Sequence, residues 1–188
     1  MLGPPILMSS NSLKNPQGFT AVELIATLAI AAVLIALAVP TFTTLTSKYK
    51  VVNEISGFVG DLGYTRAEAI KEGQTVTICA SSDGSTCSGS SNWQSGWIVY
   101  SNPNLSSTTA TAVLRRQTSW KSSDTFAADN SASSITYTSD GFIRNLPGSG
   151  VVTFTLHTSP VNSALTQCVA VNKAGRHVIQ TPGTGNCS

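Results

Sequence analysis

Charged residues are scarce in this sequence, and neither sign predominates. Of its 188 residues, 11% are charged, and the formal net charge is +2. Proteins that bind nucleic acid through their overall charge are far more basic, so composition does not place the chain in that class. A local basic patch stays open as a separate question.

The residue patterns that mark common enzymes are also absent. The sequence has no GxSxG, HExxH, P-loop or complete GxGxxG motif. Its two histidines, His157 and His177, lie in strand-like segments, where an isolated histidine is more often a packing or surface residue than a base or ligand. Asp83 and Asp140 each precede a glycine and are expected in turns rather than calcium sites. We therefore predict no enzyme, no catalytic residue, no metal and no cofactor.

The chain has few cysteines, four in all, and none forms the CxxC pair of a zinc site. Two lie close in sequence at Cys79 and Cys87, and two at Cys168 and Cys187. We expect disulfides rather than four buried free thiols. Because disulfides persist only in an oxidising compartment, the C-terminal region is expected to face the periplasm or the exterior.

The sequence has one long apolar run, residues 19–39, which includes a single charged residue, Glu23. As a helix rising about 1.5 Å per residue, the run would be about 31 Å long, which matches a hydrocarbon core of about 30 Å. We predict one transmembrane helix. Its orientation does not follow from the lysines, because Lys14 precedes it while Lys48 and Lys50 follow it. The expected disulfides require a cytoplasmic N-terminus and an outer domain.

A polar stretch, residues 9–18, precedes the apolar run, whereas a secretory signal carries its cleavage site after the run. The junction, residues 18–24 with the sequence GFTAVEL, resembles the class III signal of type IV pilins and type II secretion pseudopilins. The resemblance implies that a prepilin peptidase cuts after Gly18 and N-methylates Phe19. Residues 1–18 are then the leader, or residues 8–18 if Met8 is the true start.

The same resemblance assigns filament assembly to Glu23 and Pro40. A carboxylate inside a bilayer segment costs on the order of 2.5 to 3.5 kcal/mol at the centre, so Glu23 is expected to gain a partner. The family implies that this partner is the freed N-terminal amine, of a neighbouring subunit or its own, which sets the axial stagger in a filament. The alternative keeps Glu23 near the headgroups, paired with water. Pro40 matches the position at which pilin helices bend.

Beyond Pro40 the apolar residues recur at helical spacing, which predicts an amphipathic continuation of the helix over residues 40–72. Gly57, Gly60 and Gly63 each weaken such a helix by about 1 kcal/mol relative to alanine, and we expect them to allow close packing against strands. The residues of the expected apolar face are Val51, Val52, Ile55, Phe58, Val59 and Leu62.

After Gly73 the sequence changes to short runs of β-branched and aromatic residues, separated by turn-forming clusters. We predict an α+β pilin fold, in which the long helix packs on an antiparallel β domain of about seven strands in residues 73–188. Trp93 and Trp97 are expected to pack in its core. The predicted strands are residues 75–79, 97–100, 112–116, 135–138, 151–156, 168–171 and 177–180.

A second resemblance lies within residues 66–100, in the segments RAEAIK, VTIC, DG and WQSGWIVY. These are similar to the GspH/FimT family of minor pilins and pseudopilins. The family implies a structural role, with other pilins, a prepilin peptidase and inner-membrane lipid as partners. Two roles stay open, a FimT-like minor pilin of a type IV pilus and a GspH-like pseudopilin of the type II secretion system.

The last resemblance concerns the segment KAGRH, from Lys173 to His177. FimT-type minor pilins carry a GRxR element in such a tail, which binds double-stranded DNA during uptake for natural transformation. Here Gly175 and Arg176 match, Val178 replaces the second arginine, and Lys173 and His177 are the available substitutes. Such a loop would contact phosphates without reading bases, whereas the alternative is an ordinary turn with a solvated Arg176. Four further cations would widen the patch if the fold brings them together, namely Arg115, Arg116, Lys121 and Arg144.

Overall fold

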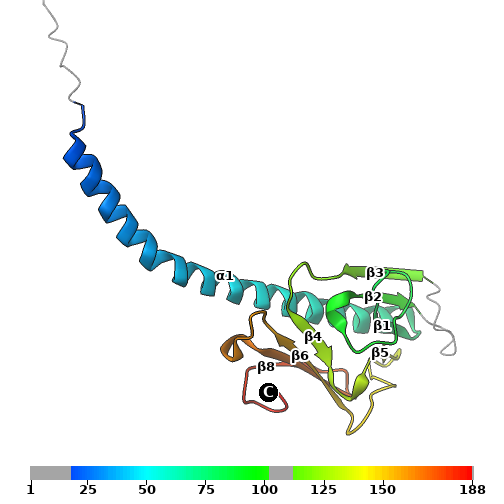
Figure 1. The fold of residues 1–188 in the computed structure, drawn as a ribbon. Coiled ribbons are helices and arrows are strands. Elements are labelled where there is room, and N and C mark those ends of the chain that lie inside the picture. Colours follow the sequence, from blue (N-terminus) through cyan, green and yellow to red (C-terminus); the bar gives the residue numbers. More distant parts are fainter. Residues whose placement is uncertain (1–17, 102–111, 188) are drawn as a thin grey trace, which may run out of the picture. The chain divides into compact units, whose positions relative to one another are not determined.

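The computed structural model describes residues 18–101 and 112–187, without the side chains of residues 39–41. The expectations for the leader before Gly18 and for the side chain of Pro40 fall outside this part of the chain. The molecule divides into two compact units, Met1–Thr43 and Thr44–Ser188. One helix, α1 (Ala21–Glu72), contributes to both of them (Figure 1).

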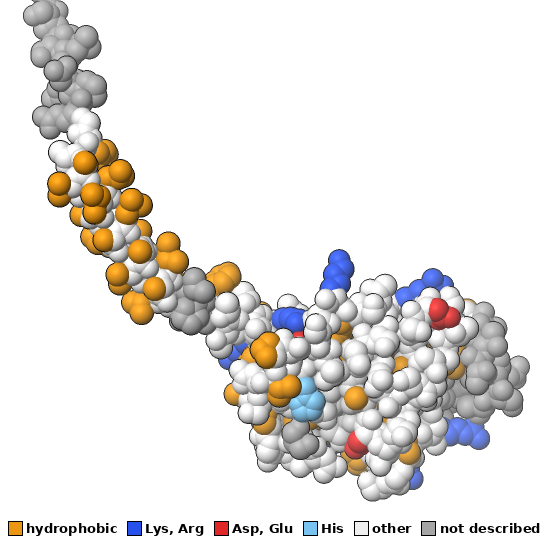
Figure 2. Space-filling view, viewed as in Figure 1, with side chains coloured by type: hydrophobic (Ala, Val, Ile, Leu, Met, Phe, Trp, Pro, Cys, Tyr) orange, Lys and Arg blue, Asp and Glu red, His pale blue; other side chains and the backbone are white. Residues whose placement is uncertain are grey.

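In the first unit, α1 exposes an almost entirely apolar surface. Every residue from 21 to 38 is exposed, and the exposed fractions of Leu28, Val33 and Leu37 are 61%, 62% and 70%. Figure 2 shows orange apolar side chains along this segment. A helix that is apolar all round is suited to an apolar medium. Within the described ranges, α1 is the one helix long and apolar enough to cross a membrane.

In the second unit, the same helix has a single buried face. Val51, Ile55, Phe58 and Leu62 are each at most 2% exposed, at the spacing of an amphipathic helix. The predicted face is too wide, because Val52 is 39% exposed. This part of α1 therefore packs through a narrow stripe.

The helix ends at Glu72, as predicted, and Gly73 follows with a φ of 66°, the left-handed conformation common just after a helix. The three glycines within this part of α1 do not have the expected role. A Cβ atom added at Gly57, Gly60 or Gly63 would meet nothing within 4 Å. The expectation that they allow close packing against strands is wrong, and all three leave open space beside the helix.

The described residues after α1 form eight strands in two antiparallel sheets, so the pilin-like α+β fold is confirmed. The strands are β1 (Val76–Ala80), β2 (Gly96–Ser101), β3 (Ala112–Thr118), β4 (Thr125–Ala128), β5 (Ser134–Tyr137), β6 (Val151–His157), β7 (Gln167–Asn172) and β8 (His177–Gln180). The first sheet has the order β3-β2-β1-β5 and the second β4-β6-β7-β8 (Figure 1). Each of the seven predicted runs overlaps one of these strands.

Strand β4 is the one that the sequence pattern does not reveal, and it raises the number of strands from seven to eight. Of its four residues, Thr125 and Phe126 favour a strand, but the other two are alanines, which strands disfavour, so the run is too short to stand out. Pairing with β6 holds it in place, with Phe126 opposite Leu156. Both of these side chains are fully buried, so tertiary packing outweighs the weak local preference.

Phe58 of α1 lies at the centre of the core and joins the two sheets. Its ring centroid is 5.5 Å from that of Trp93, 5.3 Å from Trp97, 4.9 Å from Phe126 and 4.7 Å from Phe154. Trp97 belongs to the first sheet, while Phe126 and Phe154 belong to the second. Trp93 and Trp97 are at most 1% exposed, so the expectation that they pack in the core is confirmed.

Candidate functional site

The predicted processing junction lies in the open, immediately before α1. A Cβ atom added at Gly18 would meet nothing within 4 Å, and Phe19 is 82% exposed. Thr20 caps the helix, because its Oγ1 accepts a hydrogen bond from Glu23 N at 3.3 Å and its carbonyl accepts one from Leu24 N at 3.1 Å. The bond between Gly18 and Phe19 is therefore accessible from solvent in this structure.

Glu23 lies in the first turn of α1 and is exposed. An acidic side chain at this position is favoured by the positive end of the helix dipole. The spacing Thr20-x-x-Glu23 is also that of a capping box, a signal that sequence analysis missed. Among the described residues no ion pair to Glu23 is formed. The helix start thus lowers the cost of this charge but supplies no counter-ion.

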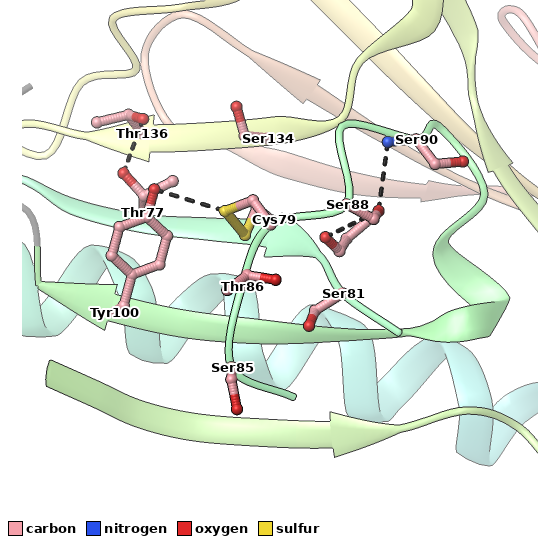
Figure 3. The surroundings of a disulfide bond; sticks show 12 residues. Thr77, Cys79, Ser81, Ser85, Thr86, Ser88, Ser90, Tyr100, Ser134 and Thr136 are labelled. Carbon is pink, nitrogen blue, oxygen red and sulfur yellow. Dashed lines mark hydrogen bonds between the residues drawn. A yellow bond between two sulfur atoms is a disulfide. The ribbon is translucent and has the colours of Figure 1, made fainter. Parts of the chain in front are cut away.

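A disulfide fastens the loop after β1 to the first sheet. Cys79 on β1 is bonded to Cys87, and the Tyr100 hydroxyl lies 3.6 Å from Cys87 Sγ (Figure 3). Within the loop, Asp83 accepts backbone hydrogen bonds from Thr86 and Ser85, both 2.8 Å long. These bonds hold the pKa of the Asp83 carboxyl well below its usual range. Asp83 is therefore a turn residue, as predicted.

A second disulfide joins Cys168 on β7 to Cys187 near the C-terminus. Cys168 lies opposite Gln180 of β8, whose carbonyl oxygen is 3.7 Å from Cys187 Sγ. The bridge therefore holds the C-terminal segment against β8. It also encloses the turn between β7 and β8, which contains the segment from Lys173 to Arg176.

Gly175 in this turn has a structural role. Its φ is 71°, and an added Cβ would collide with the carbonyl oxygen of Gly141 and lie 3.1 Å from the ring of Tyr137. Its own carbonyl accepts a hydrogen bond from Arg66 Nη1 of α1 at 3.1 Å. The glycine that matches the GRxR element is thus required by the turn itself.

The three basic residues in and beside this turn differ in how exposed their side chains are. Arg176 is exposed. Its backbone nitrogen donates a hydrogen bond to Asn172 Oδ1 and its carbonyl accepts one from Asn172 N, while in the described part of the chain its guanidinium forms no hydrogen bond. Lys173 is exposed, and its side chain runs beside Gly150. His177 is half-buried in β8, opposite Val171, so it is less available than its sequence position suggests.

Of the four additional cations, Arg144 lies near the turn, whereas Lys121 lies just before β4, at the opposite edge of the second sheet from β8. The neighbour of Arg144, Ile143, donates a backbone hydrogen bond to Lys173 O at 2.9 Å and bridges to Tyr137 of β5. Arg115 and Arg116 lie on β3, which is the opposite edge of that sheet from β5. Arg115 is also occupied elsewhere. The expectation that both β3 arginines widen the patch is therefore wrong.

Asp61 of α1 is the partner of Arg115, and sequence analysis missed it. Its carboxylate accepts hydrogen bonds from Arg115 Nη1 at 3.0 Å and from Trp97 Nε1 at 2.8 Å. The Arg115 guanidinium also lies 3.7 Å from the centre of the Tyr64 ring. The available signal was the position of Asp61 beside Leu62, at the margin of the buried stripe.

A cavity of about 200 Å³ lies farther along the same side of α1. Glu54 borders it, and the Ser122 hydroxyl donates a hydrogen bond to Glu54 Oε1 at 3.1 Å. Its other lining residues are Asn53, Gly57, Trp97, Gln117 and Trp120. Sequence analysis did not single out this site. Within the described ranges no group of three or more His, Cys, Asp or Glu residues could hold a metal ion.

An exposed apolar helix that continues into a helix packed on antiparallel sheets defines a pilin-like subunit. The chain belongs to the family described as type II transport protein GspH, whose model matches residues 54–175. Proteins of this family are structural subunits of pili or pseudopili, so the chain is a structural protein and not an enzyme.

Two solved structures with a similar fold are crystal forms of the Pseudomonas aeruginosa (strain PAO1) type IV minor pilin FimU. The P65 form has a TM-score of 0.52 and 18% identity, covering 74% of this chain and 94% of its own. The P21 form has a TM-score of 0.55 and 20% identity, covering 78% and 96%. At this level of identity the likeness establishes the fold alone. No curated protein sequence matches the chain.

Proposed function

We propose that the chain is a minor pilin of a type IV pilus. A prepilin peptidase cuts after Gly18 and N-methylates Phe19, and residues 19–39 then anchor the mature chain in the inner membrane. The N-terminus lies in the cytoplasm and the disulfide-bonded unit in the periplasm. The observation that carries this proposal is the exposed apolar surface of residues 21–38, which needs lipid before assembly and neighbouring helices after it.

Glu23 has the assembly role in this proposal. The helix dipole favours its charge at the start of α1, which Thr20 caps, but a counter-ion must come from the freed amine of Phe19, in a neighbouring subunit or the same one. The variant Glu23→Ala should still be processed, because the cleavage junction is intact, yet it should enter filaments poorly. Normal incorporation of Glu23→Ala into purified pili would contradict this role.

The second candidate is a pseudopilin of the type II secretion system, which needs the same leader, helix and fold. The family description favours it, while the likeness in fold to a type IV minor pilin favours the first candidate. Deleting the gene distinguishes them. Loss of surface pili with normal protein secretion supports the minor pilin, and loss of secretion with normal pili supports the pseudopilin.

Double-stranded DNA is the proposed extracellular ligand of the minor pilin, bound at the turn between β7 and β8. The support is an exposed Arg176 in a turn that Arg66 and the bridge from Cys168 to Cys187 hold in shape. Lys173 and Arg144 lie nearby and add to the positive charge. A site with so few cations would bind phosphates without base preference, and it would gain strength from repetition along a filament.

This proposal predicts weak, salt-dependent binding of a short duplex to the full chain in neutral detergent, measured by gel shift. Arg176→Ala should weaken binding and lower the slope of log K against log salt by about 1, the contribution of one phosphate contact. Arg116→Ala is the matched control, because Arg116 lies on β3 at the opposite edge of the first sheet. An unchanged shift with Arg176→Ala, or equal losses in both variants, would argue against this site.

A further inference from the structure

The cavity beside α1 carries a negative charge that its surroundings do not fully balance. Glu54 is the carboxylate that borders the cavity, and a second carboxylate, Asp124, and one ammonium group, that of Lys50, lie near Glu54 without lining the cavity. The Lys50 Nζ atom is 2.7 Å from Asp124 Oδ2, so Lys50 forms its ion pair with Asp124 rather than with Glu54. Glu54 receives one hydrogen bond, from Ser122 to Oε1, while its buried Oε2 has no hydrogen-bond partner in the described part of the chain. Burial raises the pKa of Glu54 and Asp124 adds to this rise, while the Ser122 hydrogen bond and the Lys50 charge oppose it without cancelling it.

The remaining walls of the cavity are suited to a cation. Trp120 stacks on Phe126 with ring centroids 5.1 Å apart, and both Trp120 and Trp97 line the cavity. Indole surfaces attract cations through their quadrupole. Asn53 and Gln117 also line the cavity, and the Gln117 amide nitrogen donates a hydrogen bond to Thr118 O, which leaves the Gln117 carbonyl oxygen as its remaining polar atom. The cavity is thus bordered by one carboxylate, two amide side chains and two indoles and, among the described residues, by no cationic side chain.

The size and access of the cavity limit what can enter. At about 200 Å³ it is several times the volume of one water molecule, about 30 Å³, so it holds one cationic head group with part of its stem. Gly57 lies on its border, and open space extends beside this glycine. A folded domain or a base pair is too large, whereas the end of a side chain from another subunit fits.

We propose that this cavity binds a lysine or arginine side chain of a neighbouring pilin subunit, with Glu54 as its counter-ion. A family whose members assemble with other pilins provides such neighbours, and the excess negative charge selects a cationic side chain. The inference rests on filament assembly but not on whether the filament is a pilus or a pseudopilus. The inference is also independent of DNA binding. The cavity is bordered by Gly57 and by Gln117 of β3, whereas the proposed DNA site is the turn between β7 and β8.

The first test uses the full chain in neutral detergent and follows its tryptophan fluorescence. N-acetyl-lysinamide and N-acetyl-argininamide should each give a saturable change, and the uncharged N-acetyl-norleucinamide should not. Glu54→Gln, which keeps the shape but removes the charge, should weaken binding of the cations by about tenfold. No saturable change, an equal response to the uncharged amide, or unaltered binding by Glu54→Gln would each overturn the proposal.

A second pair of variants guards against misfolding of Glu54→Gln. Gly57→Leu places a side chain at the rim of the cavity and should also weaken binding of N-acetyl-lysinamide. Gly60→Leu adds the same side chain where there is equally open space but no contact with the cavity, so it should bind as the unmodified chain does. Equal binding by Gly57→Leu and Gly60→Leu would contradict the assignment of the site.

A filament-incorporation assay then tests which cation occupies the cavity, a side chain of a neighbouring subunit or a free small-molecule amine. Glu54→Gln should enter filaments less efficiently, while Gly60→Leu should enter normally. If Glu54→Gln loses the fluorescence response but assembles normally, the occupant is a free amine, and the proposed subunit contact is wrong. The fluorescence result stands whichever filament system the chain serves, so failure of the minor pilin proposal would be seen separately.

Discussion

The two parts of α1 are both rich in apolar residues, yet they use them differently. Residues 21–38 expose apolar side chains on every side, whereas Val51, Ile55, Phe58 and Leu62 form one buried stripe. The first pattern satisfies a helix surrounded by lipid or by other helices, and the second a helix on the surface of a folded unit. One continuous helix thus serves two environments, and the change in periodicity marks where one gives way to the other.

The largest expected effect is on the folded unit. Phe58→Ala should lower the free energy of unfolding by about 3 to 5 kcal/mol, because Phe58 contacts four aromatic rings, three of which lie on strands of the two sheets. Leu28→Ala removes a side chain of similar character from the exposed segment and should leave unfolding unchanged. Urea unfolding of the full chain in detergent, followed by tryptophan fluorescence, measures both. Similar losses in the two variants would remove the distinction between the two parts of the helix.

A smaller effect of opposite sign is expected at the helix glycines. Gly60→Ala and Gly63→Ala should each raise the free energy of unfolding by about 1 kcal/mol, because an added Cβ meets no other atom within 4 Å. Gly175→Ala is the contrasting variant and should be destabilising, since Gly175 has a φ of 71° and no room for a Cβ. In thermal unfolding, the midpoint should be higher than that of the unmodified chain for Gly60→Ala and Gly63→Ala and lower for Gly175→Ala. Destabilisation by Gly60→Ala would show that the helix needs this glycine for its own packing.

The smallest effect concerns pH. Burial raises the pKa of Glu54, so folding favours its protonated form. Protonated Glu54 therefore adds to the free energy of unfolding at pH values below the ordinary glutamate pKa. This contribution is lost as pH rises through the pKa of Glu54 in the folded state. The difference in unfolding free energy between Glu54→Gln and the unmodified chain should grow in favour of the variant from about pH 4 to about pH 7. Glu72→Gln, at the exposed end of α1, is the control, and a pH-independent difference for Glu54→Gln would refute this interpretation.

Much of the fold follows from the sequence because the strongest signals are periodic. The apolar run, the helical stripe through Phe58 and seven short β-rich runs predict the long helix and most of both sheets. Strand β4 does not follow, because its alanines have little strand preference and its pairing with β6 depends on distant residues. The excess width of the predicted apolar face has a similar cause, since periodicity does not tell a buried Val51 from an exposed Val52.

The candidate sites are less predictable, because their key contacts join residues far apart in the chain. Local sequence places Gly18, Phe19 and Glu23 at the start of α1 without further help. The hydrogen bond from Arg66 to Gly175 and the pairing of Asp61 with Arg115 depend on the folded unit, and the local sequence identifies neither partner, although it places Asp61 at the margin of the buried stripe. The cavity at Glu54 is less visible still, since its lining residues come from α1, β2, β3 and the residues after β3.

The most direct test of the account is the intact mass and the location of the protein as its own cells produce it. We expect the mature chain to begin at an N-methylated Phe19 and to be recovered with the inner membrane or with filaments, because its apolar helix segment requires one or the other. A mature chain that begins at another residue, or that is recovered as a soluble cytosolic protein, would contradict the central claim.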